Sequence, residues 1–148
     1  MINIIKTKEL ADKCDQLLTK LIRDEKQYDD SIDNEFEVKN FYSNIINDDE
    51  KTLFGYFVND ELVGYLYLIE IVSNNNKGFK IDALFMEEEY RNHGYAKELI
   101  KEAIMFAEGN EGKFIDINVM NSNIIAKNLY EGLGFNPLRV EMRRNINT

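Results

Sequence analysis

The most constraining feature of the sequence is an apolar segment at 79–86 that leads through a glycine into a helical pattern and then into a second apolar segment at 114–119. Within the helical pattern, from Gly94 to Glu108, apolar residues recur at 96, 99, 100, 103, 104 and 107, which is the spacing of one helix face. Two strands joined by a helix form a right-handed parallel crossover in one sheet. We therefore expect 79–86 and 114–119 to be parallel strands of the same sheet.

The other segments predict antiparallel neighbours for this pair. Apolar patterns and turn residues predict strands at 2–6, 53–58, 62–72 and 135–143, and helices at 7–23, 35–46 and 122–133. Asn59-Asp60 and the cluster at 74–78 are turn sequences, and Gly134 stands where a left-handed residue ends a helix. The expected fold class is α/β, with a mixed, mostly antiparallel sheet of six or seven strands flanked by helices.

Length and composition predict a single domain over 1–148. A chain of 148 residues with 44% hydrophobic residues can bury a core without disulfides or metal. One cysteine, Cys14, and one histidine, His93, offer neither an internal disulfide nor a zinc ligand set, so no metal is expected. The sequence has no signal-peptide pattern and no apolar run that could span a bilayer, so a cytoplasmic protein without a membrane partner is expected.

The charge distribution narrows the class of partner. The formal net charge of −9 argues against a nucleic-acid binder, because binding to phosphates needs a basic face. Ten acidic and two basic side chains lie between residues 24 and 50, so the excess is local. This region is either a solvated surface or an electrostatic funnel for a cationic substrate.

A candidate binding site lies where the first strand of the crossover ends and its helix begins. The sequence there is Arg91-Asn92-His93-Gly94-Tyr95-Ala96. The free N–H groups of a first helical turn carry partial positive charge, and small residues let a ligand approach the backbone. The pattern suits a pyrophosphate, although a glycine can also merely ease a tight strand-to-helix turn.

Two motifs together resemble the GNAT superfamily of acyl-CoA-dependent N-acyltransferases. The segment from Arg91 to Ala96 is similar to its Arg/Gln-x-x-Gly-x-Gly/Ala loop. About thirty residues later, 123–135 is similar to its Asn-x-x-Ala-x-x-Leu-Tyr-x-x-x-Gly-Phe signature. The resemblance covers at least 62–135 and fits the expected element order. It implies the acyl-CoA N-acyltransferase fold, with the sheet splayed where the coenzyme inserts.

The same resemblance implies acetyl-CoA as cosubstrate and a set of residues that would hold it. Backbone groups on the first crossover strand would pair with the pantetheine arm, amides of the loop and first helical turn would hold the pyrophosphate, and an asparagine would hydrogen-bond the arm. These residues are Leu84, Phe85 and Met86 for the strand, Arg91, Asn92, His93, Gly94, Tyr95, Ala96 and Lys97 for the loop, and Asn123 for the arm.

For catalysis, the resemblance assigns Tyr130 as the acid that protonates the leaving thiolate. A thiol pKa near 8.5 and a tyrosine pKa near 10 make this proton transfer feasible without a large shift. Tyr130 also fits the apolar face of an ordinary amphipathic helix, together with Ala126, Leu129 and Leu133.

The general base that accepts the proton of the amine could be Asp82, Glu70 or a chain of water molecules. Asp82 is expected on the same strand face as Leu84 and Met86, and Glu70 lies on the preceding strand. Either could instead be an exposed strand carboxylate. Asn118 stands where some relatives have a glutamate, which weakens the transfer of a ribosomal-protein acetyltransferase mechanism.

The expected function is therefore transfer of an acetyl group from acetyl-CoA to a primary amine of a small cationic acceptor, such as an aminoglycoside or a polyamine. The alternatives are a protein or peptide amino group as acceptor, and a non-catalytic acetyl-CoA-binding module. The tail from Arg139 to Thr148 could close the sheet or pair with a second subunit to give a homodimer.

Overall fold

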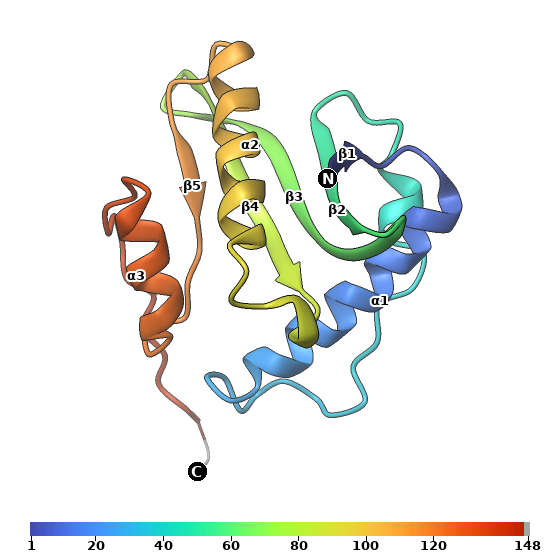
Figure 1. Cartoon of the computed structure of the whole chain (residues 1–148). Helices are drawn as coiled ribbons and strands as arrows, with labels where there is room; N and C mark the ends of the chain where they lie inside the picture. Colours follow the sequence, from blue (N-terminus) through green and yellow to red (C-terminus); the bar gives the residue numbers. More distant parts are fainter. Residues whose placement is uncertain (147–148) are drawn as a thin grey trace.

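The computed structural model describes residues 1–146, which form one sheet with helices on both faces (Figure 1). The elements in chain order are β1 (Ile2–Ile4), α1 (Lys8–Glu25), the 3₁₀ turn η1 (Tyr42–Asn44), β2 (Lys51–Val58), β3 (Glu61–Ser73), β4 (Asn76–Met86), the 3₁₀ turn η2 (Glu88–Tyr90), α2 (Tyr95–Gly109), β5 (Ile115–Ile117) and α3 (Ile124–Gly132).

The sheet has the order β1-β2-β3-β4-β5. All neighbours are antiparallel except β4 and β5, which are parallel and joined through α2, so the predicted crossover is confirmed. Both hairpins use two-residue turns with left-handed backbone: φ is 50° and 64° at Asn59 and Asp60, and 52° and 66° at Asn74 and Asn75. Such turns match the twist of the paired strands, and asparagine and aspartate tolerate this conformation.

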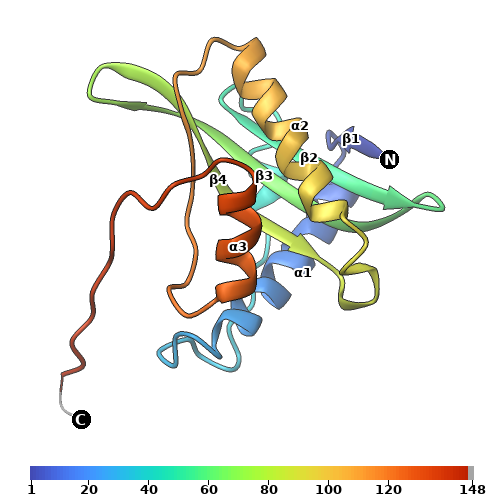
Figure 2. The ribbon, with the colours of Figure 1, turned by 60° about the vertical axis from the view of Figure 1, so that its left-hand side comes forward.

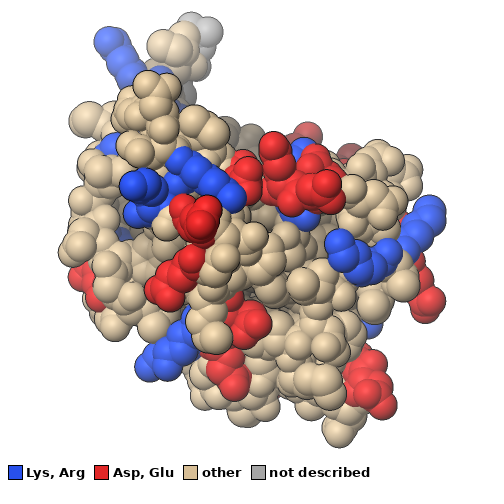
Figure 3. Space-filling view, turned by 90° about the horizontal axis from the view of Figure 1, so that it is seen from above, with Lys and Arg blue, Asp and Glu red and all other residues tan. Residues whose placement is uncertain are grey.

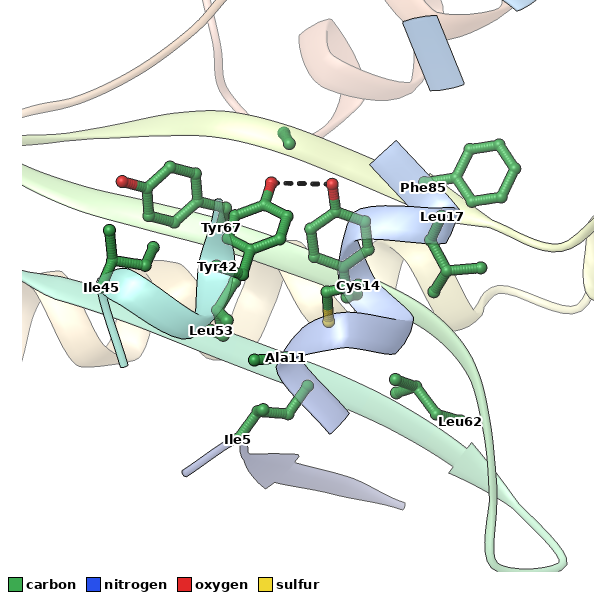
Figure 4. Close-up of a cluster of buried hydrophobic side chains, with 12 residues drawn as sticks. Ile5, Ala11, Cys14, Leu17, Tyr42, Ile45, Leu53, Leu62, Tyr67 and Phe85 are labelled. Carbon is green, nitrogen blue, oxygen red and sulfur yellow. Dashed lines mark hydrogen bonds between the residues drawn. The ribbon is translucent and has the colours of Figure 1, made fainter. Parts of the chain in front are cut away.

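Helix α1 covers one face of the sheet, and α2 and α3 cover the other (Figures 1 and 2). Under α1, Tyr42 of η1 and Tyr65 of β3 join their hydroxyls at 2.8 Å within the apolar cluster that also holds Cys14 and Leu17 (Figure 4). Burial first, and then the neighbouring Asp15, raises the pKa of the Cys14 thiol to about 12, so this cysteine is a neutral core residue.

The helix expected at 35–46 is wrong, because α1 takes the backbone donors that such a helix would use. The Asp15 carboxylate accepts hydrogen bonds from the N–H groups of Phe41 and Tyr42, at 3.3 and 3.0 Å. The Thr19 hydroxyl accepts one from Val38 at 2.9 Å. Asn40 has φ of 57°, which a right-handed helix cannot include. The segment therefore lies extended along α1, with only the short η1 turn.

The closing strand expected at 135–143 is also wrong, and the sheet has five strands among the described residues rather than six or seven. After α3 the chain runs away from the body as an extended tail (Figure 2). In its described part, up to residue 146, Arg143 forms an ion pair with Asp29, in the segment after α1. The tail therefore does not close its own sheet; Asn147 and Thr148 lie outside the described residues.

Candidate active site

A β-bulge at Asp82 marks the place where β5 leaves β4. On the β3 side, Tyr67 is paired with Ala83 and Leu68 with Ile81, so Asp82 has no partner of its own. On the β5 side the ladder ends at Ile81 paired with Ile117. A bulge bends its strand and increases the local twist. The two parallel strands diverge beyond it (Figure 1), and in the described chain no strand pairs with Leu84–Met86 on that side.

The same bulge moves Asp82 away from the face on which we expected it. Leu84 and Met86 pack in the cluster under α2 and α3, whereas Ala83 and Phe85 pack under α1. The carboxylate of Asp82 contributes to raising the pKa of Tyr67, after burial, to about 12, and Tyr67 belongs to the α1 cluster. Asp82 is therefore an exposed carboxylate on the α1 face, and the expectation that it shares a face with Leu84 and Met86 is wrong.

The amino end of α2 is open to a ligand. Gly94 is its N-cap, with φ of 81°, and makes no side-chain cap hydrogen bond. A Cβ built on Gly94 would meet nothing within 4 Å, so the glycine is required by its backbone conformation and not by crowding. Asn92 is also left-handed, with φ of 65°. The N–H groups at the start of α2 thus carry the partial positive charge of the helix without a side chain to cap them.

The loop between β4 and α2 is held rigid by its own side chains. The Nε of Arg91 donates to the Met86 carbonyl at 2.8 Å, and its guanidinium lies over the Phe85 ring at 5.2 Å. The His93 ring stacks on Tyr95, with ring centroids 5.3 Å apart, and Tyr95 stacks on Tyr56 of β2 at 4.4 Å. The loop backbone is therefore fixed before any ligand arrives, and Arg91 is engaged by the protein.

Tyr130 lies on α3 and packs, half-buried, against the cluster that contains Leu84 and Met86. Its ring makes an edge contact with Phe135, with centroids 6.1 Å apart. Burial raises the pKa of its phenol, and the carboxylate of Glu25 raises that pKa further. Tyr130 therefore remains a protonated donor at neutral pH.

Asn123 and Glu70 each already interact with another residue of the protein. The Asn123 side-chain oxygen accepts from the Ala126 N–H at 3.2 Å and so caps α3. This bond leaves the amide NH₂ of Asn123 available for another acceptor. Glu70 forms an ion pair with Lys77 at 3.2 Å across the β3–β4 hairpin, and its register partner is Phe79. Glu70 thus lies on the hairpin side of the bulge, away from the α2 loop.

The family model of the GNAT acetyltransferases matches residues 16–135, which include the bulge, the α2 loop and Tyr130. The chain belongs to the GNAT acetyltransferase family. It is therefore an acyltransferase by family, and the resemblance found in its two motifs is confirmed. No curated protein matches the sequence of this acetyltransferase significantly.

Solved structures share the fold of this acetyltransferase. A mutant form of the BH1408 protein from Bacillus halodurans superposes with a TM-score of 0.86, at 15% identity over 99% of each chain. The aminoglycoside N-acetyltransferase AAC(6')-Iy in complex with CoA gives 0.75, at 15% identity over 99% of each chain. The ribosomal-protein-alanine N-acetyltransferase from Brucella melitensis biovar Abortus 2308 gives 0.71 at 16% identity, covering 99% of this chain and 98% of that one. At these identities the likeness shows the fold and leaves the acceptor open.

Sequence reasoning missed the residues that α1 brings to the site. Asp24 forms an ion pair with Arg91 at 3.2 Å, and Lys20 forms one with Glu87 at 2.9 Å. The two residues of each ion pair lie 67 positions apart along the chain, so no local sequence pattern predicts these pairs. The one available signal was the acidic excess that begins at Asp24.

None of the helices of this acetyltransferase within residues 1–146 is long and apolar enough to cross a membrane. In the same part of the chain, no three His, Cys, Asp or Glu side chains gather in a way that could hold a metal ion.

Proposed function

We propose that residues 1–148 form one catalytic domain that transfers an acetyl group from acetyl-CoA to a primary amine of a small cationic acceptor. The observation that carries this proposal is the juxtaposition of two backbone features: the uncapped amino end of α2 at Gly94, and the edge of β4 at Leu84–Met86. This edge lacks a strand partner in the described chain, and of its groups the Met86 carbonyl is already bound by Arg91. The end of α2 fits a pyrophosphate, and the edge of β4 fits an extended arm that contains amide groups. The structural neighbour with CoA bound supports a coenzyme of this kind.

The coenzyme would be held mainly by backbone. Amides from Asn92 to Lys97 would bind the pyrophosphate, with His93 at most an additional donor at its edge. Arg91 would act by shaping the loop, since its guanidinium is already bound to Met86 and Asp24. The free amide NH₂ of Asn123 would donate to the pantetheine arm.

The reaction would be direct attack of a neutral amine on the thioester carbonyl. The C–N bond forms, the C–S bond breaks, and Tyr130 gives a proton to the departing thiolate. Of the two carboxylates expected from the sequence, Asp82 lies exposed where β4 and β5 part, whereas Glu70 would first have to leave Lys77. Placing both reactants in one complex would supply much of the rate.

Only part of the acidic region 24–50 lies where it supports a cationic acceptor. Residues 24–37 lie near the end of α1 and the α2 loop, whereas 48–50 lie at the other end of the molecule (Figure 1). At that other end, acidic side chains form separate groups with basic ones between them (Figure 3). The proposed funnel is therefore the part that begins at Asp24. Aminoglycosides and polyamines carry several ammonium groups, which suits such a surface, and a protein amino group is the alternative acceptor.

Release of CoA from acetyl-CoA tests the proposal when it is measured against aminoglycosides, polyamines and peptides with free amino groups. We expect turnover with the polycationic small molecules. Turnover with peptides alone would contradict the proposed small cationic acceptor and favour a protein or peptide amino group. Coenzyme binding without turnover on any amine would favour the non-catalytic module instead.

Replacing Gly94 by valine is expected to weaken acetyl-CoA binding at least about tenfold. A β-branched residue at φ of 81° costs about 1–2 kcal/mol or shifts the loop that should cradle the pyrophosphate. Calorimetric titration of acetyl-CoA measures the effect. Gly132→Ala is the matched control, because Gly132 also has open space around its Cβ but ends a helix without positive φ. Equal affinities of the two variants would contradict the proposed pyrophosphate site.

We also propose that the tail makes a homodimer by adding a strand to the free edge of β5 in a second copy. Leu138, Val140 and Met142 alternate along the tail and are 72%, 74% and 90% exposed. Alternating apolar residues match one face of a strand, and β5 is the edge strand of the sheet. Light scattering should show a dimer for the full chain and a monomer for a chain ending at Phe135. A monomeric full chain would contradict the proposal.

A further inference from the structure

The loop between β4 and α2 is surrounded by acidic side chains, although its proposed ligand is an anion. Glu87, Glu88 and Glu89 follow β4 directly, and Asp24 at the end of α1 lies against the loop residue Arg91. Negative charge beside a pyrophosphate opposes its binding. Within residues 1–146, the carboxylates of Glu87 and Asp24 each form an ion pair with a cation of the protein, whereas those of Glu88 and Glu89 form none.

Glu87 is fastened both by its side chain and by its backbone. Both of its carboxylate oxygens accept hydrogen bonds from Nζ of Lys20 on α1, each at 2.9 Å. Its backbone N–H donates to the Val63 carbonyl of β3 at 2.8 Å, and its carbonyl accepts from the N–H of Tyr90 at 2.9 Å. The Glu87 side chain is only 25% exposed, so salt screens this pair less than it screens a fully exposed pair. Glu87 therefore fixes the point at which the loop leaves β4.

Asp24 holds the arginine that shapes the middle of the loop. The end of α1 and the segment after β4 lie side by side (Figure 1), and the Asp24 carboxylate accepts from the Arg91 guanidinium at 3.2 Å. The Nε of Arg91 donates to the Met86 carbonyl at 2.8 Å, and its backbone N–H donates to the Glu88 carbonyl at 3.2 Å. Arg91 thus connects α1 with the end of β4, shortly before the N-cap Gly94.

The loop is also fixed where it enters α2. Tyr95, the first residue of α2, stacks on Tyr56 at 4.4 Å, and the Tyr56 hydroxyl donates to Glu98 at 2.6 Å. A ligand that meets a loop already fixed in its bound conformation does not have to overcome the conformational entropy of ordering it. Repulsion between exposed charges, in contrast, is screened within about 10 Å at 0.1 M salt. The gain from fixing the loop therefore outweighs the repulsion.

Resting on the proposed function, we propose that Glu87 and Asp24 are positioning residues for the coenzyme. Through Lys20 and Arg91 they hold the loop in the conformation that binds the pyrophosphate. They raise the affinity for an anionic ligand although each of them carries a negative charge. Helix α1 is by this inference a part of the coenzyme site, although it lies on the face of the sheet opposite to α2.

The test is calorimetric titration of full-length Glu87→Gln and Asp24→Asn with acetyl-CoA at 0.1 M salt. We expect the Kd to rise about three- to fivefold in each variant and about tenfold in the double variant, because partly exposed ion pairs are individually weak. Charge alone predicts the opposite sign, since each substitution removes a negative charge near an anion. Glu88→Gln is the matched control, because it removes the same charge from the same loop at an exposed side chain, and its Kd should stay unchanged or fall.

Three further readouts separate positioning from damage to the fold. Glu87→Lys should raise the Kd although it adds a positive charge, and Lys20→Glu in the same chain should restore the Kd to within about twofold of wild type. In Glu87→Gln the KM for acetyl-CoA should rise with the Kd while kcat stays within about twofold, because bound coenzyme restores the loop. Hydrogen exchange of the Tyr90 and Arg91 amides should be faster in free Glu87→Gln than in free wild type.

The outcomes keep this inference apart from the proposed function. If wild type binds acetyl-CoA while Glu87→Gln and Asp24→Asn bind it equally well or more tightly, the positioning role is wrong and the coenzyme site stands. A charge-reversed pair that folds without restoring the Kd, or a fall of kcat at unchanged Kd, also contradicts the positioning role alone. If wild type binds no acetyl-CoA, both proposals fail together.

Discussion

Tyr130→Phe is expected to lower kcat about 100-fold while acetyl-CoA affinity stays within about twofold of wild type. General acid catalysis contributes about 10²–10⁴-fold, and phenylalanine removes the donor but keeps the ring that packs against Phe135. Since burial and Glu25 raise the pKa of this phenol, the basic limb of the wild-type profile should lie above the usual range of tyrosine. Steady-state kinetics from pH 6 to about 11 would show both effects.

The control for this variant is Tyr90→Phe, at the end of η2, which also removes one phenol near the α2 loop. Turnover of Tyr90→Phe should match wild type. If Tyr130→Phe does so as well, Tyr130 is a packing residue of α3 and the thiolate must take its proton from water.

Asp15→Ala is expected to lower the free energy of unfolding by about 3 kcal/mol. The Asp15 side chain is nearly fully buried, and its two oxygens accept the N–H groups of Phe41 and Tyr42. Its removal leaves two backbone donors near the core without a partner, at about 1–3 kcal/mol each. Loosening of η1 would also disturb the hydroxyl pair of Tyr42 and Tyr65. Urea denaturation followed by circular dichroism measures the loss.

Asp12→Ala is the matched control on the same helix. Asp12 is exposed and pairs with Lys8 at 2.6 Å, a surface ion pair that contributes about 0.2–1 kcal/mol. A loss in Asp15→Ala no greater than in Asp12→Ala would mean that the segment 38–42 is held by its apolar contacts alone.

The elements that could be predicted from the sequence are those fixed by neighbours in the chain. The turns at Asn59-Asp60 and Asn74-Asn75 determine both hairpins, and the apolar spacing of α2 determines the crossover. Gly134 is left-handed as its position after a helix suggests, with φ of 95°. The family resemblance followed from two short motifs for the same reason, since each is contained in a single loop and helix.

The features that could not be predicted depend on contacts between distant segments. The apolar residues of 35–46 fit a helix, but Asp15 and Thr19 of α1 bind the backbone there instead. The tail has the alternation of a strand but finds no partner within the described chain. A single bulge reverses the face of Asp82, which the alternation of β4 alone does not reveal. Asp24 reaches the α2 loop through its ion pair with Arg91, which lies 67 positions further along the chain.

The most direct test of the central claim is a titration of the isotope-labelled protein with acetyl-CoA, followed by backbone amide NMR. We predict that the largest chemical-shift changes fall on the amides from Gly94 to Lys97 and on Leu84–Met86, with smaller changes at Asn123. Saturable binding with these changes would place the coenzyme between the uncapped end of α2 and the free edge of β4. Binding whose changes fall elsewhere, or no binding at millimolar acetyl-CoA, would contradict the account.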